Sequence, residues 1–458
     1  MIGTYATLTD YYSSANSGSG GSAELEVWFL PGDDLTHGGS EPYETFANRL
    51  NSGEGKLNQF FKSSYILIAR ANKVLEKLQL ADPAIFTTPN MQGYNEGEAL
   101  FLRGFAHFML WNVFGSAPVD TIVVKSTSQF NIPSSQGTAL LDQAIADLTR
   151  AASLLPTTAW DANNLGRVTA NSAYGMLGKA LVFRASANDS DADYQAAITA
   201  FNQISGVTLV ADFGANFRSN AENNNESLFE FQGGKNIIGQ GQNTWLANDA
   251  CDCGVAGSYY QMFYDGDGSY MGGGRYSPTN KLKNTFAATD PRLPLTLNAA
   301  KTLVVKYVVG GDVLDGAVNS LNNHRVLRYA DVLLLKAEAI LQSGGSTTEA
   351  IGLINQVRTR ARSMPGGTTE PANLNAAETN ATTIMQWIMD ERFRELAAEG
   401  HRWFDLRRWH MAGHITLANA FFDSETPGDM EFAENNLLFP IPDSETSRNP
   451  NITQNPGY

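Results

Sequence analysis

The sequence predicts a mainly α-helical protein, in which paired helices form a scaffold that carries a large irregular insert and a few short strands. Three observations support this fold class. Apolar residues recur about every 3.6 positions along most of the first half of the chain. Two distant stretches share one helix–loop–helix layout. A segment rich in glycine and asparagine, without helical periodicity, separates those stretches.

We expect one domain over residues 1–458. Its helical scaffold should occupy about 56–205 and 326–411, the insert about 206–325, and an extended C-terminal tail 430–458. Helices are expected at 56–78, 94–115, 139–156, 167–187, 193–204, 326–344, 347–361 and 380–411. Within the insert, the run at 302–309 has the composition of a short strand.

Local signals support individual helices. The stretch 94–115 is apolar on nearly every side, which predicts a buried helix. It should stop at Gly115, because Pro118 follows shortly after. Ser346 precedes the helix expected at 347–361, and Glu349 lies three residues later in its first turn. This capping-box spacing should fix where the helix begins.

A faint internal repeat suggests how the helices pair. Residues 178–204 and 335–358 each read as an alanine-bearing helix, a polar loop and a second helix that opens on Ala-Ile. Small residues at a helix crossing allow close approach, as in tetratricopeptide-type hairpins. The stretch 97–156 can be read in the same way with a longer connection. The sequence therefore predicts three or four helix pairs of the tetratricopeptide type.

Composition and charge exclude several classes of protein. The formal net charge of −15, from 32 basic and 47 acidic residues, repels phosphate backbones, so no nucleic-acid partner is expected. No run of about 18 apolar residues predicts a membrane span. The first residues lack the basic and apolar regions of a signal peptide. Cys251 and Cys253 lie in one loop, where a plain thiol pair is favoured over a redox or metal site.

Residues 391–409 are the densest group of ionisable side chains. Its carboxylates and His401 could act as general acids and bases. On a continuous helix, however, Glu391–Arg394, Glu399–Arg402 and Asp405–Arg408 stand three apart and can pair, as can His401 and Asp405 four apart. Phe393, Leu396, Ala397, Gly400 and Phe404 would form an apolar seam. We therefore interpret this stretch as structural, since catalytic groups usually converge from several elements.

Other loops offer candidate binding residues. Asp33, Asp34 and His37 follow an apolar run and could bind a polar ligand, although an Asx-type turn explains them equally well. The loop with Asp265 and Asp267 resembles half of a calcium loop, but the later carboxylates are absent and a tight turn is favoured. No metal site or cofactor is expected. Sequence motifs for hydrolases, metalloproteases, dinucleotide binding and P-loops are also absent, so we expect no enzyme.

The insert carries aromatic residues interleaved with asparagine, glutamine, aspartate and glycine. Such rings can stack on the C–H face of a sugar while amides and acids bond its hydroxyls. Alternatively, most of them anchor the insert to the helices. The group of rings also includes Phe263 and Tyr276. The ligand-binding candidates that we choose, besides the loop at 33–37, are Trp245, Tyr259, Tyr260, Tyr264 and Tyr270.

Four segments in order resemble the SusD/RagB-type outer-membrane lipoproteins over nearly the whole chain. They are "DERFRELAAEGHRWFDLRRW" (390–409), "RYADVLLLKAEAI" (328–340), "GEALFLRGFAHFMLWNVFGSAPV" (97–119) and "LLFPIPDSETSRNPNITQNPGY" (437–458). The resemblance implies four tetratricopeptide-like helix pairs with an irregular ligand-binding region opposite them. It carries over no ligand residues, because the binding loops of this family have no fixed motif.

The resemblance also implies a function. Members of this family are non-enzymatic proteins that capture glycans, or in some cases peptides, at the outer face of the outer membrane. They deliver the ligand to a SusC-type TonB-dependent transporter, which they cover as a lid. The implied membrane attachment is an N-terminal lipid anchor that this chain lacks, and we expect it in a preceding segment. A peptide-binding protein or a mainly structural lid of the transporter is the alternative.

Overall fold

The computed structural model describes residues 1–12, 25–38, 42–46, 50–126, 129–233, 263, 276–307, 322–422 and 430–458. Its longer helices are α4 (Gly55–Leu80), α5 (Met91–Phe114), α6 (Ala139–Leu154), α7 (Ala170–Asn188), α8 (Asp191–Phe201), α11 (Tyr329–Gln342), α12 (Thr347–Ser363), α13 (Ala381–Glu395) and α14 (Arg402–Met411). Shorter ones are α1 (Ile2–Ala6), α2 (Thr9–Tyr12), α3 (Pro42–Thr45), α9 (Asn280–Thr285), α10 (Leu293–Thr296), α15 (Asn419–Phe422) and α16 (Asp443–Arg448).

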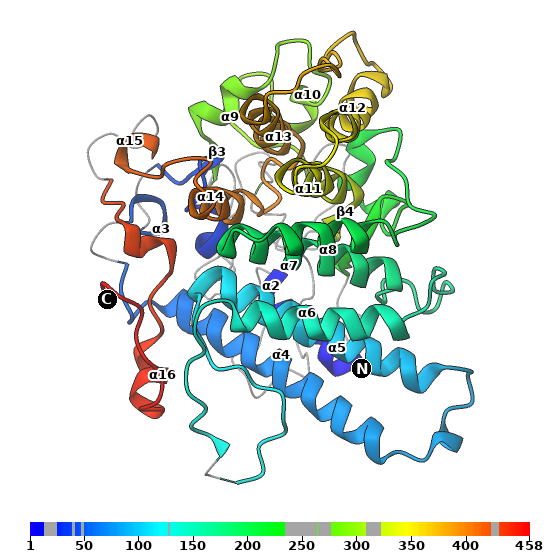
Figure 1. The fold of residues 1–458 in the computed structure, drawn as a ribbon, viewed down its shortest axis with the longest axis vertical. Helices are drawn as coiled ribbons and strands as arrows, with labels where there is room; N and C mark the ends of the chain where they lie inside the picture. The colour runs from blue at the N-terminus through cyan, green and yellow to red at the C-terminus, as the bar shows by residue number, and fades with distance from the viewer. Residues whose placement is uncertain are drawn as a thin grey trace, which may run out of the picture.

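The helices pack in sequence order as a stack. Helix α4 packs on α5, α5 on α6, α6 on α7 and α7 on α8. Helix α11 then contacts α8 and pairs with α12, and α13 packs on α11 (Figure 1). The antiparallel pairs α5/α6, α7/α8 and α11/α12 are the three hairpins that the repeat predicted, so the predicted mainly α fold class is confirmed.

Strands are few and short. Strands β2 (Ser227–Phe231) and β4 (His324–Arg328) pair antiparallel, and so do β1 (Leu35–Thr36) and β3 (Ser277–Pro278). Strand β2 is buried along most of its length, and its Phe229 ring packs edge-on against Phe101 and Phe105 of α5. This two-stranded sheet therefore ties the region after α8 to the centre of the helical stack.

Most predicted helices lie within a few residues of the observed ones. Helix α5 is buried from Gly97 to Phe114, as its apolar composition predicted, and it ends at Gly115. The side chain of Ser346 accepts a hydrogen bond from the Glu349 N–H at the start of α12, which confirms the predicted cap.

Four boundaries differ from the prediction. The expected helix 326–344 begins as β4 and becomes helical only at Tyr329, because residues 324–328 pair with β2. The expected helix 380–411 is two helices. The run at 302–309 is not a strand over its described part, where Val304 makes a single bridge to Leu297. The tail contains the short helix α16 between extended stretches.

The break between α13 and α14 follows from local backbone geometry. Residues 396–401 leave the helical path, and Ala398 and Gly400 have φ angles of 58° and 81°. A side chain at Gly400 would place its Cβ 2.8 Å from the indole Nε1 of Trp28, so the chain passes too close for any residue but glycine. The chain therefore leaves the helical path here, and α13 and α14 are separate helices.

Candidate functional site

The carboxylates of residues 391–409 are buried in ion pairs rather than exposed in a site. The Glu395 carboxylate contacts Arg292 at 2.9 Å and Arg328 at 2.6 Å, and it also bonds Arg360. These four side chains are buried. Burial by itself would raise the pKa of Glu395, but the three guanidinium groups hold it below its usual value. Glu395 therefore stays ionised as a structural anion.

A second buried network joins α7, α11, α13 and α14. Asp331 pairs with Lys179 and with Arg392, both at 2.8 Å. Arg392 also binds Asp405 at 2.8 Å, and Asp405 binds Arg408 at 2.9 Å. The predicted Asp405–Arg408 pair is thus present, but it lies in the core and not on a solvated helix face.

The predicted Glu391–Arg394 pair is also present, at 3.9 Å, whereas the other predicted on-helix pairs are replaced by contacts between distant elements. Glu399 binds Lys306 at 2.6 Å and Arg328 at 2.7 Å, whereas Arg402 binds Asp33. The expectation that one continuous helix would pair its own charges was wrong for Glu399, because the chain turns at residues 396–401 and directs the carboxylate inward. The interpretation of residues 391–409 as structural still holds, because their charges are paired within the core even without one continuous helix.

His401 is also a core residue. Its Nδ1 lies 3.1 Å from the Lys179 ammonium. Burial, and next the neighbouring Lys179 charge, lower the pKa of His401 to about 4, so the imidazole is neutral at physiological pH. Its predicted partner Asp405 is instead held by arginines.

The loop residues Asp33 and Asp34 anchor the N-terminal segment to the α13–α14 break. Asp33 binds Arg402, with Nη2 at 3.1 Å, and Lys281 at 3.3 Å. Asp34 accepts a hydrogen bond of 3.0 Å from the Ala398 N–H. Both carboxylates are almost fully buried, at 3% and 1% exposed. In this structure they bond the scaffold, so we do not place them in the proposed binding surface.

His37 is half-buried near the same loop. Its backbone N–H donates to Glu44 at 3.0 Å, and its ring centre lies 5.8 Å from that of Tyr276, which is buried. Phe263 is buried as well. The other five predicted ligand residues lie outside the described residues: Trp245, Tyr259, Tyr260, Tyr264 and Tyr270. Both cysteines and the Asp265–Asp267 loop also lie outside them.

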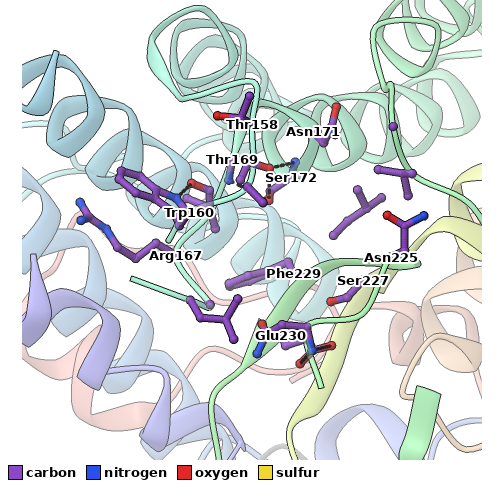
Figure 2. Close-up of a pocket in the computed structure, with 18 of the residues that line it drawn as sticks. Thr158, Trp160, Arg167, Thr169, Asn171, Ser172, Asn225, Ser227, Phe229 and Glu230 are labelled. Atoms are coloured by element: carbon purple, nitrogen blue, oxygen red, sulfur yellow. Dashed lines mark hydrogen bonds between the residues drawn. The ribbon is translucent and has the colours of Figure 1, made fainter. Parts of the chain in front are cut away.

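A pocket of about 430 Å³ opens between the α6–α7 connection and β2 (Figure 2). This volume falls in the range of small-molecule sites. Its lining is rich in hydroxyl and amide groups, including Thr157, Thr158, Thr169, Asn171, Ser172, Ser205, Asn223, Asn224, Asn225 and Ser227. Trp160 and Asn225 lie on opposite sides of it, with the Phe229 ring between them (Figure 2).

Hydrogen bonds fix the walls of this pocket. The Asn171 side chain donates to the Ser205 carbonyl at 2.8 Å and accepts from its N–H at 3.2 Å, which joins the start of α7 to the segment after α8. The Trp160 Nε1–H donates to the Val168 carbonyl at 3.0 Å and closes the α6–α7 connection on itself. The pocket is therefore preformed by the scaffold.

Sequence reasoning did not single out this pocket. Its residues come from three separate segments, around 157–172, 205–207 and 223–230, that only the fold brings together. The available signal was Trp160 in a long connection rich in threonine and asparagine, which is the same aromatic and amide pattern that drew attention to the insert.

The described residues give no sign of a metal centre or a membrane span. Among them, no three histidine, cysteine, aspartate or glutamate side chains are grouped so that they could hold a metal ion. Likewise, no helix in the described part of the chain is both long and apolar enough to cross a bilayer.

The fold and the pocket define a helical-scaffold protein with a polar and aromatic pocket of ligand size. Residues 295–458 match the SusD family, and residues 35–181 match the family described as starch-binding, associating with the outer membrane. These matches support a SusD/RagB-type protein.

Individual relatives match over almost the full chain. SusD-like protein P2 of Formosa agariphila is 26% identical over 99% of this chain and 92% of its own. A SusD superfamily protein of Bacteroides vulgatus, whose crystal structure is known, is 26% identical with a TM-score of 0.72, covering 100% of this chain and 98% of its own. A structure described as a laminarin-binding SusD-like protein has the same fold, with 23% identity and a TM-score of 0.76 over 100% of this chain and 98% of its own.

Proposed function

We propose that this protein is a non-enzymatic cell-surface glycan-binding protein that captures oligosaccharide or polysaccharide and delivers it to a SusC-type TonB-dependent transporter. The family matches carry the proposal, because the family that residues 35–181 match is described as starch-binding and associating with the outer membrane. The laminarin-binding protein of the same fold agrees with a carbohydrate ligand. On this proposal the protein acts at the extracellular face of the outer membrane, attached through a lipid anchor.

The chemistry of the described pocket supports a sugar ligand. Its hydroxyl and amide groups can exchange hydrogen bonds with sugar hydroxyls, and the half-buried ring of Trp160 offers apolar surface to the C–H face of a pyranose. The aromatic residues of the insert, Trp245 and Tyr260 among them, are proposed to add further contacts along a longer glycan. A glycan that occupies several weak subsites at once binds with a higher overall affinity than one that occupies a single subsite.

The pocket also supports a binding role rather than hydrolysis. Glycoside hydrolysis commonly needs two carboxyl groups that flank the scissile bond. Glu230 is the one carboxylate among the described residues that line the pocket, and it is buried and bonded to the protein. We therefore expect capture without cleavage.

Isothermal titration and affinity electrophoresis against a panel of polysaccharides test this function, with reducing-end release measured in parallel. Binding of at least one glycan without new reducing ends is the expected result. Binding of peptides with no glycan bound would contradict the proposal, and released reducing ends would contradict its non-enzymatic part.

Two variants test the contribution of the insert. Trp245→Ala and Tyr260→Ala should each weaken glycan binding, because each removes one stacking surface. Phe130→Ala is the matched control, since Phe130 is a ring 64% exposed that lies outside both the pocket and the insert. Equal binding by all three variants would exclude these two rings from the site. Co-purification with the co-expressed transporter tests the partnership separately.

A further inference from the structure

We infer that the pocket between the α6–α7 connection and β2 selects neutral sugar units and disfavours uronic-acid and sulfated units. This inference rests on the proposed function, which supplies carbohydrate as the class of ligand. The reason is that the guanidinium group at the pocket and the Ala170 and Ser172 N–H groups at the start of α7 are already bonded within the protein. A ligand carboxylate or sulfate would lose water without gaining an unpaired cation, which is costly.

Among the described residues, the cation that lines the pocket is Arg167, and its donors are engaged. Its Nε and Nη2 donate to the two oxygens of the buried Glu98 carboxylate, at 2.8 and 2.7 Å. Nη1 donates to Asn164 at 2.8 Å and Nη2 also to Asn95 at 3.2 Å. The guanidinium carbon lies 4.0 Å from the centre of the Trp160 ring. Arg167 is thus fixed by protein contacts, with its charge balanced by Glu98 rather than available to an anionic ligand.

The start of α7 is a second potential anion site, and the protein itself bonds its Ala170 and Ser172 N–H groups. Backbone N–H groups at a helix N-terminus attract anions. Here the Ser172 N–H donates to the Thr169 hydroxyl at 3.4 Å, and the Thr169 N–H donates to the Ser172 hydroxyl at 3.0 Å (Figure 2). The Ala170 N–H donates to the Pro156 carbonyl at 2.9 Å. These donors therefore do not need a ligand.

The remaining charge on the lining is negative and is also internal. Both Glu230 oxygens accept from the Asn223 N–H at 3.1 Å, and one accepts from the Asn323 amide at 2.8 Å. The Arg325 guanidinium lies 3.3 Å away. What the pocket offers a ligand is mostly uncharged: hydroxyls, amides and the Trp160 ring. The chain's net charge of −15 adds a long-range repulsion for polyanionic glycans.

Titration of the protein with oligosaccharides of equal length tests this inference. The probes are maltohexaose and laminarihexaose as neutral chains, and hexagalacturonate as the anionic chain. We expect a neutral chain to bind at least roughly tenfold more tightly than the uronate, the ratio that a difference of about 1.4 kcal/mol gives. Tighter binding of the uronate would overturn the inference while leaving glycan binding intact. Absence of binding to every glycan would instead contradict the proposed function.

A positive charge introduced at the rim of the pocket tests whether the pocket is where neutral and anionic glycans are distinguished. Thr158 is exposed and lines the pocket, and Thr158→Lys should raise affinity for hexagalacturonate by roughly two- to fivefold, as an exposed ion pair does. Thr149→Lys is the matched control, because Thr149 is exposed on α6 and does not line the pocket. An equal gain in the two variants would show that net charge alone decides, which would overturn the role of the pocket.

A variant that removes one polar side chain from the pocket tests whether the neutral glycan binds there. Asn225→Ala removes an exposed amide from the pocket and should weaken binding of the neutral chain roughly two- to tenfold, the cost of one hydrogen bond. Asn202→Ala removes an exposed asparagine that does not line the pocket and should leave binding unchanged. Circular dichroism confirms that the variants fold. Unchanged binding by a folded Asn225→Ala, together with no specific effect of Thr158→Lys, would place the sugar elsewhere.

Discussion

At the scale of single residues, buried ionic groups decide how the core is assembled. Arginines from α12, β4 and the segment before α10 converge on Glu395, a glutamate at the end of α13. A buried ion pair adds little net stability compared with apolar packing, but the loss of one partner leaves the others uncompensated. The networks therefore specify which elements meet more than they strengthen the fold.

The variant Glu395→Gln tests this arrangement. It removes the charge that balances three buried guanidinium groups, so we expect the free energy of unfolding to fall by about 3–5 kcal/mol. Chemical denaturation measures this change. Glu434→Gln is the matched control, since Glu434 is 75% exposed in its pair with His410 and should matter by less than about 1 kcal/mol. Equal effects of the two variants would show that the buried network is not structural.

Asp34 gives a prediction about pH. Burial is the main cause that raises its pKa from 3.8 to about 6, and the neighbouring Asp33 charge also raises it. The folded state therefore binds this proton more tightly than the unfolded state. The resulting stability is fully present below about pH 4 and is lost as the pH rises through about 6.

The variant Asp34→Asn removes that proton linkage. It keeps an oxygen that can accept from the Ala398 N–H. Relative to the variant, the wild-type protein should lose about 1–3 kcal/mol of stability between pH 4 and pH 7. Urea unfolding at several pH values measures the difference curve. A flat difference curve would mean that Asp34 is ionised in the folded protein throughout this range.

At the scale of elements, the break between α13 and α14 determines which partners the side chains of residues 391–409 contact. The chain turns over residues 396–401 with positive φ at Ala398 and Gly400. This turn lets Asp34 bond the Ala398 N–H and lets Arg402 reach Asp33, so a loop near the N-terminus is attached to the second half of the scaffold.

Two glycine substitutions separate backbone strain from steric contact. Gly400 and Gly413 have φ angles of 81° and 75°, so alanine at either position costs about 1–2 kcal/mol. At Gly400 the new Cβ would also lie 2.8 Å from Trp28, whereas at Gly413 nothing lies within 4 Å. Gly400→Ala should therefore lower the thermal midpoint clearly more than Gly413→Ala. Equal shifts would show that Trp28 gives way at no cost.

At the scale of the whole molecule, the net charge of −15 sets how binding should respond to salt. A neutral glycan held by hydrogen bonds and stacking does not depend on screened charges, so its affinity should change by less than about twofold between low and high ionic strength. Binding of a uronate chain should improve with salt as the repulsion is screened. Titrations at two sodium chloride concentrations measure both. A strong loss of neutral-glycan affinity with salt would contradict an uncharged recognition surface.

The sequence by itself determined the helical scaffold, its pairing into hairpins and the family. Helix α5 was predictable because an all-apolar helix must be buried, and α12 because Ser346 supplies a local cap. These are short-range effects: periodicity, capping and stop signals act within a few residues.

Tertiary structure alone decided which charges meet and where a ligand fits. The stretch 391–409 predicted ion pairs three residues apart, but Glu399 and Arg402 found partners distant in sequence, since the helix breaks between them. Asp33 and Asp34 gave no local sign that they would be buried. The pocket unites Trp160 with Asn225 only after α7 and α8 fold together. Such contacts depend on packing between distant segments, which local sequence patterns do not encode.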